Sequence, residues 1–269
     1  MNIPLDIQSL PESFKNALKQ RYLYRYRKLN TYFEEILTKN QLHFANLKDL
    51  NDPFEGKAEI DSNNSELEIQ EFLINDQFEK IINQKSTEFK TREELKWVAE
   101  RMINMPITFQ RIGEETINSQ IDKCFVCCFS NTVDNKLLWS HYADEHKGVC
   151  LKFDVKEDED FFAFLLQVIY QENRPIYNHI NEALNFIDKI IATKSIDWKY
   201  EEEYRIWKGE RGPHKFKKNA LVEIVFGCRT SIGDIMKIKG LAIKNGFSHL
   251  VFKQARLKNN GYGLEFMNV

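Results

Sequence analysis

Three consecutive glutamates, Glu201 to Glu203, lie between aromatic residues in the stretch WKYEEEYRI, residues 198–206. Side chains of an extended strand alternate between two faces, so Glu201 and Glu203 are expected on one face and Glu202 on the other. Neighbouring carboxylates raise each other's pKa and hold cations or hydroxyl hydrogens, which is useful where positive charge develops on a reacting sugar. The plainer interpretation is that Arg205 and nearby lysines neutralise these carboxylates on an exposed strand edge. The spacing alone leaves both interpretations open.

A second candidate site is the turn NDPFEGK, in which Asp52, Glu55 and Lys57 resemble the carboxylates and lysine of metal-dependent nucleases. Such sites place the first acid on an earlier strand, whereas these three residues share one turn that contains a proline and a glycine. A turn in which Asn51 and Asp52 bond to their own backbone explains the residues equally well.

The third candidate is a run of cysteines, Cys124, Cys127 and Cys128, followed by His141 and His146. On a strand these cysteines point to alternating faces, and the two histidines are five residues apart on a helix rather than the four typical of zinc-binding pairs. The pattern favours cysteines that serve as core hydrophobes.

The elements that must position these residues belong to a globular chain of 269 residues, 42% of them hydrophobic. The formal net charge of −2 gives no overall attraction to nucleic acid or to an anionic membrane, although a local basic groove remains compatible with it. No apolar run reaches the ~20 residues that span a bilayer, and the five cysteines fit reduced thiols. We therefore expect a cytoplasmic protein without a membrane partner.

Periodicity predicts short strands interleaved with helices. The predicted strands are RYLYRYRKL (21–29), a short strand and turn in QLHFANLKDLNDPFEG (41–56), CFVCCFS (124–130), VCLKFD (149–154), FLLQVIYQ (164–171), YRIWKG (204–209), LVEIVFG (221–227), HLVFK (249–253) and GYGLEFM (261–267). The predicted helices are NTYFEEILTK (30–39), DNKLLWSHYADEHKG (134–148), residues 180–196 and about 231–244. Because helices and strands do not alternate regularly, we expect a single α+β domain with a mixed or antiparallel sheet, and a helical insert at about 65–121.

Several of these stretches resemble, in the same order, the bacterial family catalogued as domain of unknown function 2971. They are LYRYRKL, LNDPFEG, LLWSHYADEHKGVCLKFD, VIYQ, WKYEEEYRI and IVFGCRTS. The resemblance covers nearly the whole chain apart from the helical insert, and the tryptophan helix and the glutamate stretch are its most specific parts.

A more remote resemblance is to ADP-ribosyltransferases and related NAD-binding toxins, which carry an early basic residue, a central aromatic or serine element and a late glutamate pair. The resemblance implies a split, mostly antiparallel sheet with surrounding helices. It implies that Glu203 binds a ribose hydroxyl and that Glu201 binds or deprotonates the nucleophile. The implied NAD-binding residues are Arg25 or Arg27 for the pyrophosphate, Tyr24 or Tyr142 for the nicotinamide end, and Ser140 as the alternative to Tyr142 in the central element.

The function implied by this resemblance is transfer of ADP-ribose from NAD to a protein or nucleic acid, or hydrolysis of NAD. Such an enzyme could act as a toxin or a phage-defence effector with an antitoxin or regulatory partner. The alternatives are a non-catalytic nucleotide-sensing or partner-binding module and the metal-dependent nuclease around Asp52, Glu55 and Lys57. The first alternative and the enzyme both require Arg25, Tyr142 and Glu203 to converge on one cleft.

Overall fold

The computed structural model describes residues 8, 10–61, 64, 65, 67, 68, 71, 72, 106–182 and 185–269. Ten strands within this described part form one large mixed sheet, which confirms the α+β class. They are β1 (Tyr22–Arg27), β2 (Gln41–Asn46), β4 (Phe125–Ser130), β5 (Val149–Asp154), β6 (Leu165–Gln167), β10 (Glu203–Lys208), β11 (Gly212–Lys215), β12 (Leu221–Phe226), β13 (Val251–Leu257) and β14 (Leu264–Asn268). Two small parallel pairs are formed by β3 (Glu59–Ile60) with β8 (Ile176–Tyr177) and by β7 (Ile169–Gln171) with β9 (Thr193–Ser195).

The large sheet runs in the order β11-β2-β4-β1-β5-β12-β13-β14, with β10 and β6 attached beyond β4. All its described pairs are antiparallel except β12 with β13, so the sheet is mostly antiparallel, as predicted.

The large sheet opens beside β4. Strand β10 pairs with β4 along its whole length, whereas β1 pairs with it only through Tyr24 and Ser130, and β2 pairs only at its opposite end. Where β1 and β4 have separated, Arg25 Nη1 donates a hydrogen bond to the Cys128 carbonyl. A side chain therefore satisfies a β4 acceptor in the opening, and the backbone groups of both strands are left facing a gap.

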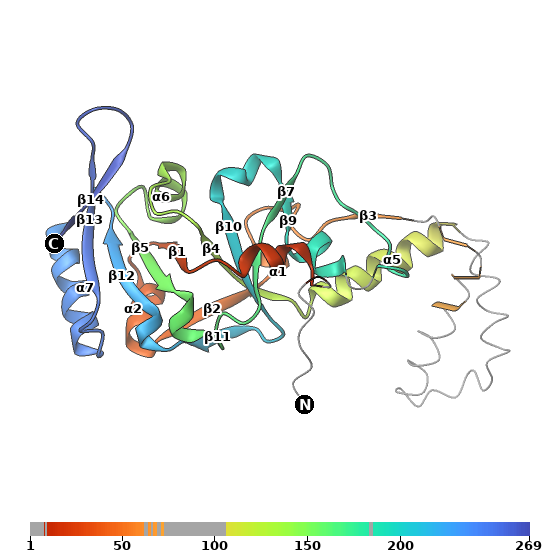
Figure 1. The fold of residues 1–269 in the computed structure, drawn as a ribbon, viewed down its shortest axis with the longest axis horizontal. Coiled ribbons are helices and arrows are strands. Elements are labelled where there is room, and N and C mark those ends of the chain that lie inside the picture. The colour runs from red at the N-terminus through yellow and green to blue at the C-terminus, as the bar shows by residue number, and fades with distance from the viewer. Residues whose placement is uncertain are drawn as a thin grey trace.

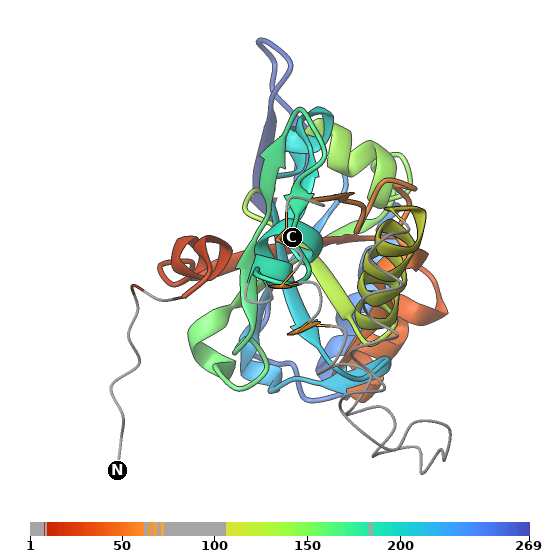
Figure 2. The same ribbon diagram turned by 90° about the vertical axis from the view of Figure 1, so that its right-hand side faces the viewer.

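The helices lie on both sides of the strands, as Figure 1 and Figure 2 show: α1 on one side, α5 and α6 on the other. The α-helices are α1 (Glu12–Ala17), α2 (Thr31–Lys39), α5 (Pro106–Ile121), α6 (Lys136–Tyr142) and α7 (Ile232–Lys244). The shorter helices are η2 (Leu47–Asp49), η3 (Val155–Asp158), η5 (Ile187–Ile191), η6 (Ile196–Glu201) and η7 (Lys218–Ala220). None of the described helices combines the length and apolar composition that a membrane crossing requires.

Helix α6 is fixed by local chemistry at both ends. The Asn135 side chain accepts hydrogen bonds from the backbone N–H groups of Leu137 and Leu138, which is a standard N-cap. Trp139 is fully buried, donates to the Val133 carbonyl at 2.8 Å and packs edge-on against Tyr26. The Trp139 side of α6 is thereby anchored against β1, and the adjacent Leu138 and Tyr142 are turned toward the opening of the sheet.

The end of α6 depends on glycine. Asp144, Glu145 and His146 all have positive φ and end the helix before the predicted boundary at Gly148. A Cβ on Gly148 would lie 2.2 Å from the Arg27 carbonyl oxygen. This close approach holds the end of the α6 segment against β1.

Several predicted elements differ from the structure. The single strand predicted for residues 164–171 is divided into β6 of the large sheet and β7, which pairs only with β9. Residues 180–196 were expected to form one helix, but their described part contains the π-helix η5, then strand β9. The stretch WKYEEEYRI is not one strand either: η6 ends at Glu201, Glu202 is left-handed with φ 45°, and β10 begins at Glu203. Of the predicted insert at 65–121, helix α5 is described; most of the remainder lies outside the described residues, so the insert stays a prediction.

Candidate functional site

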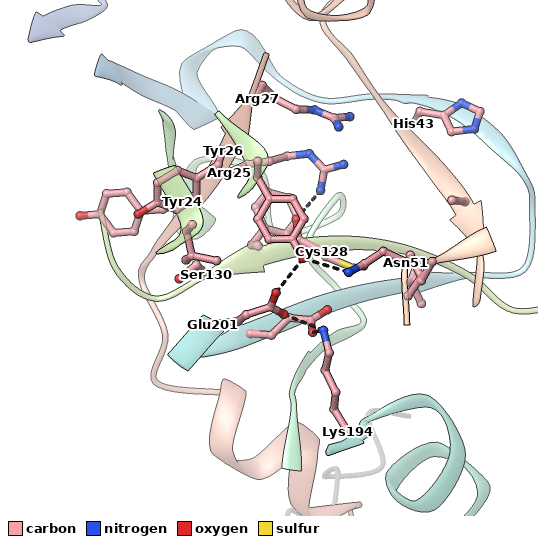
Figure 3. A pocket seen from close by; sticks show the side chains of 17 residues that line it. Tyr24, Arg25, Tyr26, Arg27, His43, Asn51, Cys128, Ser130, Lys194 and Glu201 are labelled. Carbon is pink, nitrogen blue, oxygen red and sulfur yellow. Dashed lines mark hydrogen bonds and ion pairs between the residues drawn. The ribbon is translucent and has the colours of Figure 1, made fainter. Parts of the chain in front are cut away.

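A cavity of about 310 Å³ occupies the place where β1 separates from β4. Its walls come from β1, β2, β4, α6, β9, η6 and β10, segments that are far apart in the sequence. The lining residues are Tyr24, Arg25, Tyr26, Arg27, His43, Ala45, Leu50, Asn51, Val126, Cys128, Phe129, Ser130, Leu138, Tyr142, Lys194, Glu201 and Glu203. Figure 3 shows Arg25 and Arg27 at one side of this cavity and Glu201 and Lys194 at the opposite side.

The basic end of the cavity is made by Arg25, Arg27 and His43. No carboxylate among the described residues forms an ion pair with either arginine. Repulsion from Arg25, together with burial, lowers the pKa of Arg27 to about 9. Burial and the nearby arginines Arg211, Arg27 and Arg25 lower the pKa of His43 in turn, so this histidine is neutral at pH 7. Two adjacent cations without an acidic partner form a region of positive potential that favours an anion.

The middle of the cavity is spanned by the Tyr142 hydroxyl. Leu138 and Tyr142 are four residues apart on α6, so both face the cavity while Trp139 faces the core. The Tyr142 hydroxyl donates to Glu201 Oε1 at 2.7 Å and accepts a long 3.4 Å hydrogen bond from Asn51 Nδ2. Burial, then the Glu201 carboxylate, raises the pKa of Tyr142, so its phenol stays protonated and remains a donor.

The acidic end of the cavity is one face of a buried charge cluster, formed by Glu55, Lys194, Glu201, Glu203 and Arg205. Their side chains are between 0% and 7% exposed. Lys194 Nζ lies 2.6 Å from Glu201 Oε2, 3.0 Å from Glu203 Oε2 and 3.4 Å from Glu55 Oε1. Arg205 Nε donates to Glu203 Oε1 at 2.7 Å, and its Nη2 donates to Glu55 Oε1 at 2.8 Å. Three carboxylates against two cations leave the buried charge cluster with a surplus of one negative charge.

Pairing keeps this buried charge cluster ionised. Burial alone would raise the pKa of Glu203, but the Arg205 guanidinium and the Lys194 ammonium outweigh burial and lower that pKa to about 2. Burial opposes the charge of Lys194 as well, and the carboxylates of Glu203 and Glu201 overcome it and raise the pKa of the ammonium. Both Glu203 oxygens are held by Lys194 and Arg205. Of the Glu201 oxygens, one is bound by Lys194 and the other by the Tyr142 hydroxyl, which itself lines the cavity.

The structure brings together six of the seven side chains that the resemblance implies: Tyr24, Arg25, Arg27, Tyr142, Glu201 and Glu203 all line the cavity. Arg25, Tyr142 and Glu203 therefore meet the requirement of converging on one cleft. Ser140 does not line it; this exposed residue lies within hydrogen-bonding distance, 3.2 Å, of His146 Nε2. By the 3.6-residue period of the helix, Ser140 lies about 100° around the axis of α6 from the buried Trp139 and about 160° from Tyr142, so it points to solvent.

The alternative group, Asp52, Glu55 and Lys57, does not converge on one point. The Asp52 side chain accepts a hydrogen bond from the Phe54 backbone N–H, as the turn interpretation predicted. Glu55 is held by Arg205 and Lys194, while Lys57 is exposed. Within the described residues, no group of three or more His, Cys, Asp or Glu side chains is arranged to hold a metal ion.

Sequence reasoning missed three residues of the site: Lys194, His43 and Asn51. Lys194 was placed in a predicted helix, and no spacing in the sequence connects it to the glutamates. His43 alternates with Leu42 and Phe44 on a strand, where an exposed histidine carries no signal of its own. Asn51 precedes Asp52 in the LNDPFEG stretch, where it indicates a turn. Nothing in its spacing predicts a hydrogen bond to Tyr142.

Comparison with known proteins gives one match. Residues 138–206 match the model of a family described as "Protein of unknown function (DUF2971)". The matched region includes Tyr142, Lys194, Glu201 and Glu203 but not the two arginines of β1. No curated protein and no solved structure matches the chain. The family match supports the resemblance to domain of unknown function 2971.

Proposed function

We propose that the cavity binds NAD and that the protein cleaves the bond between nicotinamide and ribose, passing ADP-ribose to a macromolecule or to water. The observation that carries the proposal is the convergence of Arg25 and Arg27 at one end of a single cavity with Tyr142 and Glu201 at the other. The setting follows from the resemblance: a cytoplasmic toxin or phage-defence effector with a regulatory partner.

The basic end suits the pyrophosphate of NAD. Each of its two phosphates carries one negative charge, and Arg25 and Arg27 offer two guanidinium groups that no carboxylate of the described ranges pairs with. A bound pyrophosphate removes the repulsion between the arginines and can accept paired hydrogen bonds from each planar fork. The residues present therefore fit the charged part of this substrate.

The acidic end suits the reacting ribose. When the C–N bond breaks, nicotinamide leaves with the bonding electron pair and positive charge develops on the ribose ring. The surplus negative charge of the buried charge cluster stabilises that charge. The incoming hydroxyl then forms the new C–O bond, and Glu201 accepts the proton that it releases.

The geometry favours Glu201 over Glu203 as the glutamate that contacts the substrate. Both oxygens of Glu203 are held by cations, whereas among the described residues Glu201 Oε1 is bound only by the Tyr142 hydroxyl. In this proposal Glu203 is a positioning residue: it holds Lys194, which in turn holds Glu201. The roles that the resemblance implies for the two glutamates are thus exchanged.

The test is to incubate the protein with NAD labelled in its adenylate half, with protein, nucleic acid or water as acceptor, and to measure nicotinamide release and label transfer. We expect Glu201→Gln to lower the rate by about 10²–10⁴-fold, the usual contribution of a general base. Glu202→Gln is the matched control, because Glu202 is the adjacent exposed glutamate. Absence of nicotinamide release with every acceptor would contradict the proposal.

A second candidate function is NAD binding without cleavage, as in a nucleotide sensor. The observation that favours it is the complete pairing of Glu203, which leaves that carboxylate unavailable to a ribose hydroxyl. Calorimetry separates the two candidates. A sensor binds NAD and releases no nicotinamide, and Arg25→Gln abolishes its binding while Glu202→Gln does not.

A further inference from the structure

A second hollow, of about 730 Å³, lies directly outside the cavity; it is called the outer groove below. Its lining residues are Tyr26, Arg27, Lys28, Asn30, Tyr32, Glu35, Ile36, Lys39, Gln41, His43, His141, Tyr142 and Pro213. Four of these, Tyr26, Arg27, His43 and Tyr142, also line the inner cavity, so the two spaces share a wall. A ligand in the outer groove therefore lies next to Tyr142, whose hydroxyl donates a hydrogen bond to Glu201.

The outer groove is basic although the chain as a whole is slightly acidic. Arg27, Lys28 and Lys39 line it against a single carboxylate, Glu35. Its ion pair with Lys39, at 2.9 Å, is exposed on both sides and therefore weak, so Lys39 stays accessible to a phosphate. Lys28 is exposed, and no ion pair within the described residues involves it. Three cations against one carboxylate leave the outer groove with a net positive charge, although the chain as a whole carries −2. The local positive potential favours an extended anion.

The charge of the outer groove exceeds what NAD requires. Arg25 and Arg27 already match the two phosphates of a dinucleotide, one guanidinium to each. Lys28 and Lys39 line only the outer groove and not the inner cavity. A ligand that uses them has to carry phosphates beyond those of NAD.

Aromatic surface accompanies this charge. Tyr32 lines the outer groove with 76% of its surface exposed, and Tyr26 and Tyr142 lie on the shared wall. An exposed ring beside cations is the combination that holds single-stranded nucleic acid, because cations follow the phosphates and rings stack on unpaired bases. A duplex offers no free base face to Tyr32.

We propose that the outer groove binds single-stranded nucleic acid and presents it to the inner cavity as the acceptor of ADP-ribose. The acceptor role rests on the proposed function; the binding does not. Phosphates lie on Lys28 and Lys39, and on Arg27 as well while no NAD occupies the cavity. A base stacks on Tyr32, and an acceptor oxygen or nitrogen reaches Glu201 past Tyr142. In the transfer step the acceptor atom bonds to the ribose, nicotinamide leaves with the electron pair, and the acceptor's proton passes to Glu201.

Fluorescence anisotropy with labelled 12-nucleotide dT and U strands and NAD-free protein tests the inference. Three phosphate contacts predict that affinity falls about 20-fold between 50 and 200 mM salt. Lys28→Glu is expected to weaken binding and to reduce that dependence to about sevenfold, because one contact is lost. Tyr32→Ala is expected to weaken binding about tenfold through lost stacking.

Lys156→Glu is the matched control. Lys156 is exposed and follows Asp154, which pairs with Tyr22 at the end of β1 opposite Lys28. Tyr22 and Lys28 are six residues apart along an extended segment, which is about 20 Å, and Lys156 lies near the Tyr22 end. The control is therefore expected to leave binding unchanged. Equal affinity of Lys28→Glu and Lys156→Glu for the strands would overturn the inference. The inference would also be overturned if the protein bound ADP-ribose but neither strand, and if Lys28→Glu weakened that binding.

The two proposals fail separately. Strand binding with the expected variant effects, but without nicotinamide release, supports the outer groove and contradicts the enzyme. Nicotinamide release without strand binding supports the enzyme and contradicts the outer groove.

Discussion

At the acidic end of the cavity five charged side chains neutralise most of one another's charge, whereas at the basic end two arginines lie together with no carboxylate partner in the described part of the chain. The buried charge cluster has Glu203 held at both oxygens by Lys194 and Arg205. Arg25 and Arg27 instead repel each other, and the pKa of Arg27 is lowered to about 9. The cluster side chains are fully buried and the two arginines are half-buried, so the two ends differ in burial as well as in pairing.

This difference separates charges that stabilise the fold from charges that the proposed function assigns to ligand binding. A paired buried charge costs the protein little while its partner is present and a great deal once that partner is removed. An unpaired cation costs the ligand-free protein stability, which a bound anion restores. Mutations at the two ends should therefore have opposite effects on folding and on binding.

The largest effect is expected from Arg205→Met. The substitution leaves Glu55 and Glu203 buried without the guanidinium that pairs them, and the free energy of unfolding should fall by about 3–5 kcal/mol. Urea denaturation measures the loss. Arg211→Met is the control, because its ion pair with Asp49 is 63% and 47% exposed, and exposed pairs contribute little. Equal losses in the two variants would show that burial of the pair does not matter.

Arg27→Gln tests the basic end and should have the opposite pattern. Its free energy of unfolding is expected to stay the same or rise, because the substitution removes the repulsion between two adjacent cations. Its affinity for NAD or pyrophosphate should fall by about 1.5–3 kcal/mol, the contribution of a charged hydrogen bond. Calorimetric titration and urea denaturation of one preparation give both numbers. A destabilised variant with unchanged affinity would assign Arg27 to the fold rather than to the ligand.

Acid should weaken the buried charge cluster through Glu203. Its pKa in the folded protein is about 2, below the ordinary 4.5, so the stabilisation is complete above pH 4.5 and is lost as the pH falls toward 2. In that range Glu203 adds at most about 1.4 kcal/mol per pH unit to the slope of stability against pH. Urea denaturation at several pH values should show a shallower slope in Glu203→Gln than in the wild type. Identical slopes would mean that another carboxylate carries the acid sensitivity.

The part of the site that sequence could predict depended on local order and spacing. The strand that carries Arg25 and Arg27, the helix that carries Tyr142 and the strand that follows Glu203 were all predicted from short patterns, and they line one cavity. That Glu201 and Glu203 lie side by side was also predicted, but from an incorrect backbone conformation. They share a strand face in the prediction, whereas in the structure a helix end and a left-handed Glu202 turn both carboxylates onto Lys194.

What sequence could not supply were the long-range partners. Lys194 was assigned to a helix because the apolar residues before it have helical spacing, yet η5 ends at Ile191 and β9 begins at Thr193. The pair of Arg205 with Glu55 joins residues 150 positions apart, which no local pattern encodes. Such contacts decide whether a glutamate is free or already neutralised, so the choice between Glu201 and Glu203 required coordinates.

Tyr142 lies between the two ends of the cavity, and Tyr142→Phe should destabilise the protein less than Arg205→Met. The variant keeps the ring and loses only the hydroxyl that donates to the Glu201 carboxylate, so the free energy of unfolding should fall by about 1.5–3 kcal/mol, the contribution of a hydrogen bond to a charged group. Nicotinamide release should fall more clearly, because Glu201 loses the hydrogen bond that orients its free oxygen. Ser140→Ala, on the same helix but outside the cavity, should leave release unchanged. If both variants release nicotinamide at the wild-type rate, the Tyr142 hydroxyl has no role in the release. The acidic end of the cavity then only stabilises the fold.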